Sequence, residues 1–436
     1  MKRFIAILII VAMSVGVLTA LNVQIGAFAA VDKLYVYNWG DYIDMDAIAE
    51  FESEFNIDVV YSTFDTNEIM LSSLQDQQAQ IDLICPSDYA LQRLIVQDRL
   101  EKIDFSKLSN YSNINSAITT KVDANFADLT VNNAKQKMSD YFIPYMMGTV
   151  GIVYNTSVID PEVAYEAGYG LLWNTPGISK LNRKILMKDS VREAYLAGVF
   201  YLKESGKLSD TYNNMPLSEL INYVDDTLLS QVEEAFKEQH KVISSYEVDF
   251  GKTDLVNEKA YAGLAWSGDA LWAMEDLDTL DYYVPKIGGN IWFDGWAMLK
   301  NSQNKESALK FMDFMMRPDI AMRNAMAIGY TSCESEAAVR ASATALDILE
   351  ENDYDVDEFF GDSIRYPDIS DPLLVIMKDF SDDSKLVAMW ERVKTTGLNP
   401  VNLIIIIVSS VVGVGIIILV IFLINKKKKS RRAVAA

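Results

Sequence analysis

Apolar and polar residues follow two different periods in the first part of the chain. Short apolar runs typical of buried strands occur at residues 34–37, 57–61 and 81–85. The segments between them have the period of helices, which are expected at 67–78, at 89–97 and behind Asp46, where Ile48, Phe51 and Phe55 share one face. This order predicts βαβ units and therefore an α/β fold with a parallel sheet.

A second pattern of the same kind begins near Gly148. A new strand is expected at 150–154, and further strands at 185–187, 261–266, 282–284 and 291–299, with helices at 191–202 and 306–316. Residues 31–398, which lie between two terminal segments with patterns of their own, are more than one hydrophobic core usually covers. At least two lobes are therefore expected.

The amino terminus has the pattern of a signal peptide. Lys2 and Arg3 precede an apolar run from Phe4 to about Leu21, and Ala27-Phe28-Ala29 supplies the small residues of a cleavage site. We expect residues 1–29 to be removed. No cysteine lies near this site, so an amino-terminal lipid anchor is not expected.

The carboxyl terminus has the pattern of a membrane anchor. Residues 403–424 carry no charge and are long enough for the roughly 30 Å bilayer core, so a transmembrane helix is expected at 401–424. Lysines 426–429, Arg431 and Arg432 follow it, so the tail 425–436 is basic and expected in the cytoplasm. The predicted protein is thus single-pass in the cell membrane, with its main body extracytoplasmic.

Composition narrows the classes of function. The chain has 436 residues, with 61 acidic and 39 basic side chains. Eight of the basic residues lie in the predicted signal and tail, so the exported body has a net charge of about −30. Such a body repels nucleic acid and attracts small cations. The only histidine, His240, excludes a multi-histidine metal site and a Ser-His-Asp triad, and we expect it to be a solvated helix residue.

Aromatic and acidic residues coincide at five predicted strand ends. The groups are Trp39/Asp41/Tyr42, Ser87/Tyr89, Asp189/Ser190/Glu193, Trp266/Asp269 and Trp292/Asp294. Such groups suit the capture of an organic cation, because ammonium gains about 0.5 to 2 kcal/mol from each aromatic face. Local roles compete with this interpretation: Ser190 and Glu193 fit a capping box, Asp41 and Asp269 fit helix caps, and Asp294 fits a turn.

Five spaced segments resemble bacterial spermidine/putrescine-binding proteins, the extracytoplasmic receptors of polyamine ABC importers. They are residues 37–43, 61–68, 86–89, 288–294 and 328–330. The resemblance implies a two-lobe periplasmic-binding-protein-like (type II) fold with a ligand cleft between the lobes. Lobe one would take 31–147 and 293–340, and lobe two 148–292 and 341–398.

The resemblance also implies a set of ligand-binding residues. These are Trp39, Asp41, Tyr42, Ser87, Tyr89, Glu193, Trp266, Asp269, Trp292, Asp294 and Tyr330. Their side-chain chemistry suggests their roles. Asp41, Glu193 and Asp294 would hold ammonium groups by charge-assisted hydrogen bonds. The tryptophans would flank the methylene chain, and the hydroxyl groups would add hydrogen bonds. Neither a cofactor nor a metal is expected, and the implied partners are a polyamine and a membrane permease.

Three departures from the family pattern leave the ligand open. Gly40 stands where relatives carry a hydroxyl residue, and Ser190 stands where spermidine receptors tend to have a carboxylate. Residues 266–269 resemble the putrescine type, with Asp269 as an added acid, and they favour putrescine slightly. The alternatives are a surface hydrolase with paired carboxylates and the same fold binding another cation, such as a thiamine-like compound.

The chain has two cysteines, Cys85 and Cys333. We expect them to be a pair of small buried thiols, although a disulfide is compatible with an exported protein.

Overall fold

The computed structural model describes residues 32–75, 80–248, 250–380 and 383–396. The predicted signal peptide, transmembrane helix and basic tail lie outside the described residues. The described strands are β1 (Asp32–Trp39), β2 (Ile57–Phe64), β3 (Leu83–Ile84), β4 (Thr130–Val131), β5 (Ala134–Lys135), β6 (Phe142–Asn155), β7 (Ile185–Lys188), β8 (Ile243–Glu247), β9 (Ala262–Trp266), β10 (Leu280–Tyr283), β11 (Gly289–Met298), β12 (Thr331–Ser332) and β13 (Leu374–Val375).

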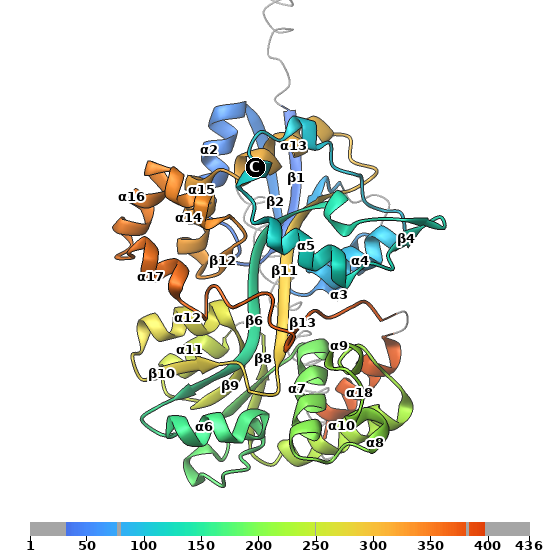
Figure 1. Cartoon of the computed structure of the whole chain (residues 1–436), viewed down its shortest axis with the longest axis vertical. Coiled ribbons are helices and arrows are strands. Elements are labelled where there is room, and N and C mark those ends of the chain that lie inside the picture. Colours follow the sequence, from blue (N-terminus) through green and yellow to red (C-terminus); the bar gives the residue numbers. More distant parts are fainter. Residues whose placement is uncertain (1–31, 76–79, 249, 381–382, 397–436) are drawn as a thin grey trace, which may run out of the picture.

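Helices cover the sheet in both halves of the molecule (Figure 1). They are α2 (Met45–Phe55), α3 (Asn67–Ser73), α4 (Asp88–Val96), α5 (Ser116–Asn125), α6 (Pro161–Ala167), α7 (Val191–Glu204), α8 (Asp210–Asn213), α9 (Leu217–Leu220), α10 (Asp226–Gln239), α11 (Gly251–Val256), α12 (Ser267–Asp276), α13 (Lys305–Met315), α14 (Pro318–Ile328), α15 (Glu336–Ala341), α16 (Ala343–Glu351), α17 (Val356–Gly361) and α18 (Ser384–Lys394).

The main sheet passes through two lobes. Its strand order is β2-β1-β3-β11-β6-β9-β7-β8. Lobe one contains β2, β1 and β3, which are parallel as predicted, and lobe two contains β9, β7 and β8, also parallel. The antiparallel pair β6 and β11 runs down the middle of Figure 1 from one lobe into the other. The two lobes are therefore joined by shared strands.

The prediction of a new strand after Gly148 is wrong, because β6 continues without a break. All fourteen residues of β6 are buried. Its first half pairs with β11, and Val150–Tyr154 pairs with β9. Gly148 lies in the middle of the strand, where a Cβ would come within 2.5 Å of Trp292 and 2.7 Å of Ser267. This glycine admits the Trp292 ring inside a strand that is shared by the two lobes.

The assignment of residues 341–398 to lobe two is only partly correct. Helices α16 and α17 pack on α14 in lobe one, through a buried cluster that includes Met322, Leu349 and Phe359. Helix α18 does pack in lobe two, where Met389 and Trp390 join the core formed around α7 and α10. The apolar faces of α16 and α17 alone did not reveal which lobe they cover.

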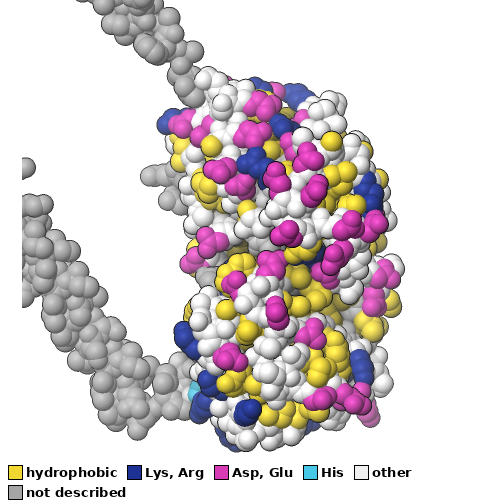
Figure 2. Space-filling model, turned by 90° about the vertical axis from the view of Figure 1, so that its left-hand side faces the viewer, with side chains coloured by type: hydrophobic (Ala, Val, Ile, Leu, Met, Phe, Trp, Pro, Cys, Tyr) yellow, Lys and Arg dark blue, Asp and Glu magenta, His cyan; other side chains and the backbone are white. Residues whose placement is uncertain are grey.

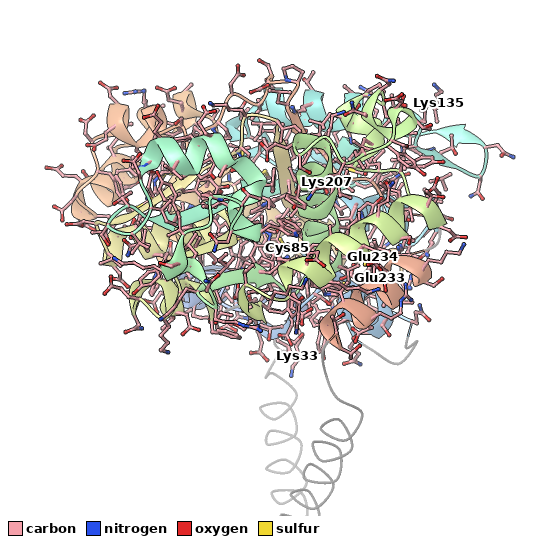
Figure 3. All side chains as sticks on the ribbon, turned by 90° about the horizontal axis from the view of Figure 1, so that it is seen from below. Lys33, Cys85, Lys135, Lys207, Glu233 and Glu234 are labelled. Carbon is pink, nitrogen blue, oxygen red and sulfur yellow. The ribbon has the colours of Figure 1, made fainter. Side chains whose placement is uncertain are left out.

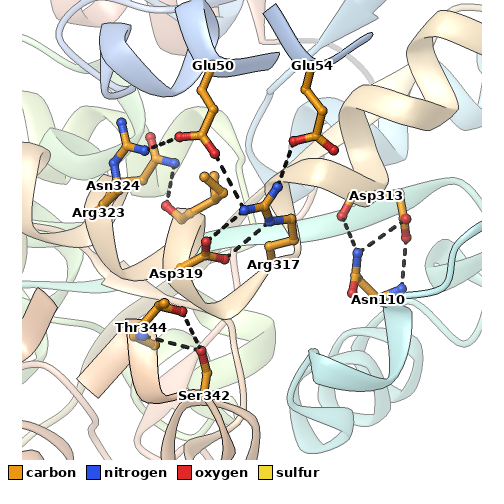
Figure 4. A network of polar contacts seen from close by, with 12 residues as sticks. Glu50, Glu54, Asn110, Asp313, Arg317, Asp319, Arg323, Asn324, Ser342 and Thr344 are labelled. Carbon is orange, nitrogen blue, oxygen red and sulfur yellow. Dashed lines mark hydrogen bonds and ion pairs between the residues drawn. The ribbon is translucent and has the colours of Figure 1, made fainter. Parts of the chain in front are cut away.

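Arginine side chains fasten α14 to α2 (Figure 4). Arg317 lies 3.0 Å from Glu54 and 2.8 Å from Asp319, and Arg323 lies 2.6 Å from Glu50. Each partly exposed pair contributes little alone, but the network orients α14. Since Tyr330 follows directly after α14, this network also positions a predicted site residue.

Both cysteines are reduced and fully buried, as the sequence favoured. Cys85 lies among the packed side chains, whereas Lys33 and Lys135 reach the periphery (Figure 3). His240 is the C-cap of α10 and is half-buried, where desolvation and then Arg183 lower its pKa. The description of His240 as a solvated helix residue therefore holds only in part.

Candidate ligand-binding site

One cavity lies between the lobes and collects every predicted site residue. Its volume is about 220 Å³. The predicted residues that line it are Trp39, Asp41, Tyr42, Ser87, Tyr89, Glu193, Trp266, Asp269, Trp292, Asp294 and Tyr330. They come from lobe one, from lobe two and from the shared strand β11.

Lobe one contributes a linked set of polar groups. Ser87 is the N-cap of α4 but makes no side-chain cap bond, so its hydroxyl is free for other partners. Asn67 donates to Ser87 Oγ at 3.1 Å and to the Tyr89 hydroxyl at 3.0 Å, and Tyr89 donates to Glu68 at 3.1 Å. These bonds fix two hydroxyls and one carboxylate on the wall of the cavity.

Asp294 lies inside β11, and not at a strand end or in a turn as the sequence suggested. The register with β6 shifts between Asp294 and Gly295, and such a bulge redirects the neighbouring side chains. The Asp294 side chain is 5% exposed, and its Oδ1 has no hydrogen-bond partner among the described residues. Burial raises its pKa to about 7, against the opposing influence of the Ser87 and Tyr42 hydroxyls.

Aromatic rings form a continuous wall beside this carboxylate. The ring centres of Tyr42 and Tyr330 are 5.3 Å apart, and those of Tyr330 and Trp292 are 5.6 Å apart. Buried polar atoms along the cavity have no protein partner among the described residues, namely Trp39 Nε1, Trp292 Nε1 and Asn290 Oδ1. Since buried polar groups normally have partners, these atoms are suited to contact a ligand.

Glu193 faces the cavity but does not form the predicted capping box. Ser190 is the N-cap of α7 without a side-chain cap bond, and its hydroxyl donates to the Glu193 carboxylate instead. Desolvation raises the pKa of Glu193, and Glu68 adds to the rise. The charge of Glu193 in turn raises the pKa of Asp294. The site therefore concentrates mutually repelling carboxylates that a cation would relieve.

Asp269 and Asp41 differ from Asp294 and Glu193, the buried carboxylates described above. Asp269 lies in the first turn of α12, lines the cavity and forms an ion pair with Lys188 at 3.1 Å, so a protein cation already balances its charge. Asp41 is exposed in the turn after β1, with a φ of 49°, and caps no helix. Asp44 is the N-cap of α2.

Sequence reasoning missed several residues of the cavity wall. Asn67 and Glu68 stand in a segment that carried the resemblance, but they received no role. Asn290 and Lys252 also line the cavity, and Lys188 lies behind Trp266. Asn290 also lies in a segment that carried the resemblance, whereas nothing local in the sequence indicated Lys252 or Lys188.

The surroundings of the cavity are acidic. Aspartate and glutamate side chains are spread over both halves of the face in Figure 2. Within the described ranges, no group of three or more His, Cys, Asp or Glu residues is arranged to hold a metal ion. The arrangement suits an organic cation by charge and by ring contacts.

The shared strands and the cavity between two α/β lobes define a two-lobe solute-binding protein of the periplasmic type. A putative spermidine/putrescine ABC transporter protein from Listeria monocytogenes matches with a TM-score of 0.66 and 26% identity, covering 83% of this chain and 98% of that one. The spermidine/putrescine ABC transporter substrate-binding protein PotD from Streptococcus pneumoniae matches with a TM-score of 0.61 and 26% identity, covering 84% and 99%.

The chain belongs to the bacterial extracellular solute-binding protein family, whose pattern matches residues 46–347. It is 29% identical over 303 residues to the spermidine/putrescine-binding periplasmic protein of Salmonella typhimurium, covering 69% of this chain and 77% of the relative. It is 27% identical over 328 residues to the putrescine-binding periplasmic protein PotF of Escherichia coli, covering 74% and 83%. The resemblance to spermidine/putrescine-binding proteins is confirmed, and the hydrolase alternative gains no support. The binding domain is extracytoplasmic, like those of these relatives.

Among the described helices, none has the length and apolar character needed to span a bilayer. The predicted anchor at 401–424 lies outside the described residues.

Proposed function

We propose that this chain is an extracytoplasmic receptor that binds a polyamine, putrescine or spermidine, and delivers it to the permease of an ABC importer. The observation that carries the proposal is Asp294, a buried carboxylate with an unpartnered oxygen in a cavity walled by rings from both lobes. A charge-assisted hydrogen bond to ammonium would be strong there, and the rings would contact the methylene chain. The names of the relatives support this ligand class.

Each wall of the cavity would have its own role. Asp294 and Glu193 would accept hydrogen bonds from ammonium groups, with Asp41 adding charge at the mouth. Trp39, Trp266 and Trp292 would flank the carbon chain, and the hydroxyls of Ser87, Tyr89 and Tyr330 would complete the hydrogen bonds. Asp269 would add a further carboxylate to this set, with each of its oxygens already accepting one bond from the protein.

The delivery step would depend on the ends of the chain. The proposal keeps residues 1–29 as a cleaved signal, 401–424 as a transmembrane tether and 425–436 as a cytoplasmic tail. A receptor held this close to the bilayer would stay near a permease at high effective concentration. The two lobes would close on the ligand about β6 and β11. Lobe one would comprise 31–147, 293–340 and helices α16 and α17, and lobe two would comprise 148–292 and the rest of 341–398.

Calorimetry on the full-length chain in detergent tests the ligand class. Putrescine, spermidine, spermine, thiamine and choline are titrated under one set of conditions. The proposal expects a polyamine to bind with a Kd tighter than about 100 μM and more tightly than thiamine or choline. Tighter binding of thiamine or choline, with no polyamine below that value, would show that the ligand class is wrong.

A further inference from the structure

Arg192 joins the two lobes beside the cavity. It lies in the first turn of α7 in lobe two, and it is 3% exposed. Its Cζ is 3.9 Å from the centre of the Tyr89 ring, which belongs to α4 in lobe one. Tyr89 lines the cavity, and so does Glu193, the neighbour of Arg192 in the sequence. A buried cation of one lobe therefore contacts a candidate site residue of the other.

The guanidinium of Arg192 is held in place from lobe two. Its Nη1 donates to Lys378 O at 2.7 Å, and its Cζ lies 4.4 Å from the centre of the Phe380 ring. These two partners are themselves attached to lobe two. The Lys378 amide donates to Asn222 Oδ1 at 2.6 Å, and the Phe380 ring lies 6.3 Å from that of Tyr195 in α7.

The Tyr89 side chain is fixed at two points that belong to different lobes. Its hydroxyl accepts from Asn67 at 3.0 Å and donates to Glu68 at 3.1 Å, and both of these residues are in lobe one. Its ring is contacted by Arg192 of lobe two. Since both side chains are withdrawn from water, this contact is of the stronger cation–π kind.

The Tyr89 ring is a main partner of this guanidinium, because other partners are few. Within the described ranges, Arg192 Nη2 makes no hydrogen bond, and it lies 3.7 Å from Asp379 Oδ1, which is beyond hydrogen-bond distance. The same oxygen accepts from Nε of Arg93 in α4 at 2.8 Å. A buried charge with incomplete hydrogen bonding depends on the contacts that remain.

The contact between Arg192 and Tyr89 is linked to ligand binding by geometry. The walls of the cavity come from both lobes, so an amine is surrounded only while the lobes are together. A side-chain contact between the lobes is lost when they separate. Such a contact raises the population of the form that is competent to bind, and the apparent Kd falls in proportion.

We propose that Arg192 is a positioning residue for amine binding, which holds Tyr89 of lobe one against lobe two and so stabilises the closed form of the cavity. This inference rests on the proposed function. Arg192 acts through the Tyr89 ring and not by contact with the ligand.

The variant Arg192→Met tests the proposal in the full-length protein. Methionine fills part of the same space without the charge or the planar group. Calorimetry should show a Kd for putrescine that is weaker by about fivefold to thirtyfold, the range expected for a desolvated cation–π contact. Stopped-flow tryptophan fluorescence should assign most of this loss to faster dissociation, because the closed form opens more easily.

Lys207→Met is the matched control for that variant. Lys207 Nζ lies 4.5 Å from the centre of the Tyr201 ring, and both residues belong to lobe two and do not line this cavity. The control therefore removes a cation–π contact that does not join the lobes. The Kd for putrescine should change by less than about twofold.

A double-mutant cycle with Tyr89→Leu separates positioning from a general loss of stability. Once the ring is absent, adding Arg192→Met should change the Kd by less than about twofold. Equal losses with and without the ring would overturn the inference, because Arg192 would then act through some other contact.

Arg192→Lys supplies an independent measurement if the methionine variant does not fold. Lysine keeps the charge but has no planar group to stack on the ring, so the Kd should still weaken by about threefold or more. Unchanged affinity in either folded variant would overturn the inference. If the unaltered protein binds neither putrescine nor spermidine, the proposed function itself has failed. If it binds them and the variants bind equally well, only the inference about Arg192 has failed.

Discussion

Tyr330 lies against Gly268 so closely that a Cβ on Gly268 would come within 2.4 Å of Tyr330 Cδ1. Gly268 is in the first turn of α12 in lobe two, and Tyr330 follows α14 in lobe one. The Tyr330 hydroxyl also donates to Asp269, next to Gly268. The absence of a side chain at Gly268 thus lets a ring of one lobe contact a helix of the other.

Replacing Gly268 by alanine should weaken amine binding. The new methyl group displaces the Tyr330 ring and disturbs its contact with Trp292, which we expect to cost about 1 to 2 kcal/mol of binding free energy. Calorimetry with putrescine measures the loss. Gly361→Ala is the matched control, because a Cβ there meets no atom within 4 Å. Unchanged affinity in Gly268→Ala would remove Tyr330 from the binding wall.

Amine affinity should fall as the pH drops below neutrality. Asp294 has its pKa raised to about 7 by burial, so in the ligand-free protein it gains a proton in this range. A protonated carboxyl forms no ion pair with ammonium, and the Kd for putrescine should rise by up to about tenfold per pH unit below 7. Titrations from pH 5.5 to 8.5 check this, and a flat profile would contradict a binding role for the Asp294 charge.

Asp294→Asn should stabilise the ligand-free protein at pH 8 while weakening binding. A carboxyl with a raised folded pKa stabilises the fold fully below its unfolded pKa, near 4, and loses that contribution as pH rises through the folded value of about 7. Removing the charge should therefore add about 1 to 3 kcal/mol to the free energy of unfolding at pH 8, measured by denaturant titration. A lower free energy of unfolding for Asp294→Asn than for the unaltered protein at pH 8 would contradict the idea that burying the Asp294 charge destabilises the fold.

Glu334→Gln is the matched control for that variant. Glu334 is 2% exposed, neither carboxylate oxygen has a partner in the described residues, and burial raises its pKa to about 9. Its contribution to stability is likewise lost as pH rises, here between the unfolded value and about 9. Glu334→Gln should thus stabilise the protein increasingly from pH 5 to pH 8, by about 1 to 3 kcal/mol at the upper end. Glu334 does not line the cavity, so the Kd for putrescine should stay the same.

Cys85 and Cys333 should be inert to thiol reagents in the folded protein. Both are fully buried, and burial raises the pKa of each thiol well above its usual value. Dithiobis-nitrobenzoate should therefore react slowly with native protein and at once with both thiols in guanidinium chloride. Absence of reaction after denaturation would mean that the two cysteines form a disulfide.

The sequence predicted the parts of the fold that depend on local pattern. The runs at 34–37 and 57–61 became adjacent parallel strands. Every predicted site residue lines one cavity, although Trp292 and Asp294 lie inside β11 and not at its end. The prediction failed for β6, where the residues on both sides of Gly148 are buried. A new strand was expected after Gly148, although the surrounding residues form one strand whose partners change along its length.

Long-range pairing explains the remaining errors. Ser190 and Glu193 have the spacing of a capping box, but Ser190 makes no cap bond and donates to the Glu193 carboxylate, which faces the cavity. No role was predicted for Lys188, whose ion-pair partners Glu247 and Asp269 are far away in the sequence. No local pattern carries that information.

A crystal structure of the protein with putrescine tests the central claim most directly. The account predicts density for the amine between the two lobes, with one ammonium nitrogen about 2.7–3.2 Å from Asp294 and the carbon chain against Trp292. A ligand bound outside this cavity, or an ammonium held by Asp269 with Asp294 left unpartnered, would contradict the account.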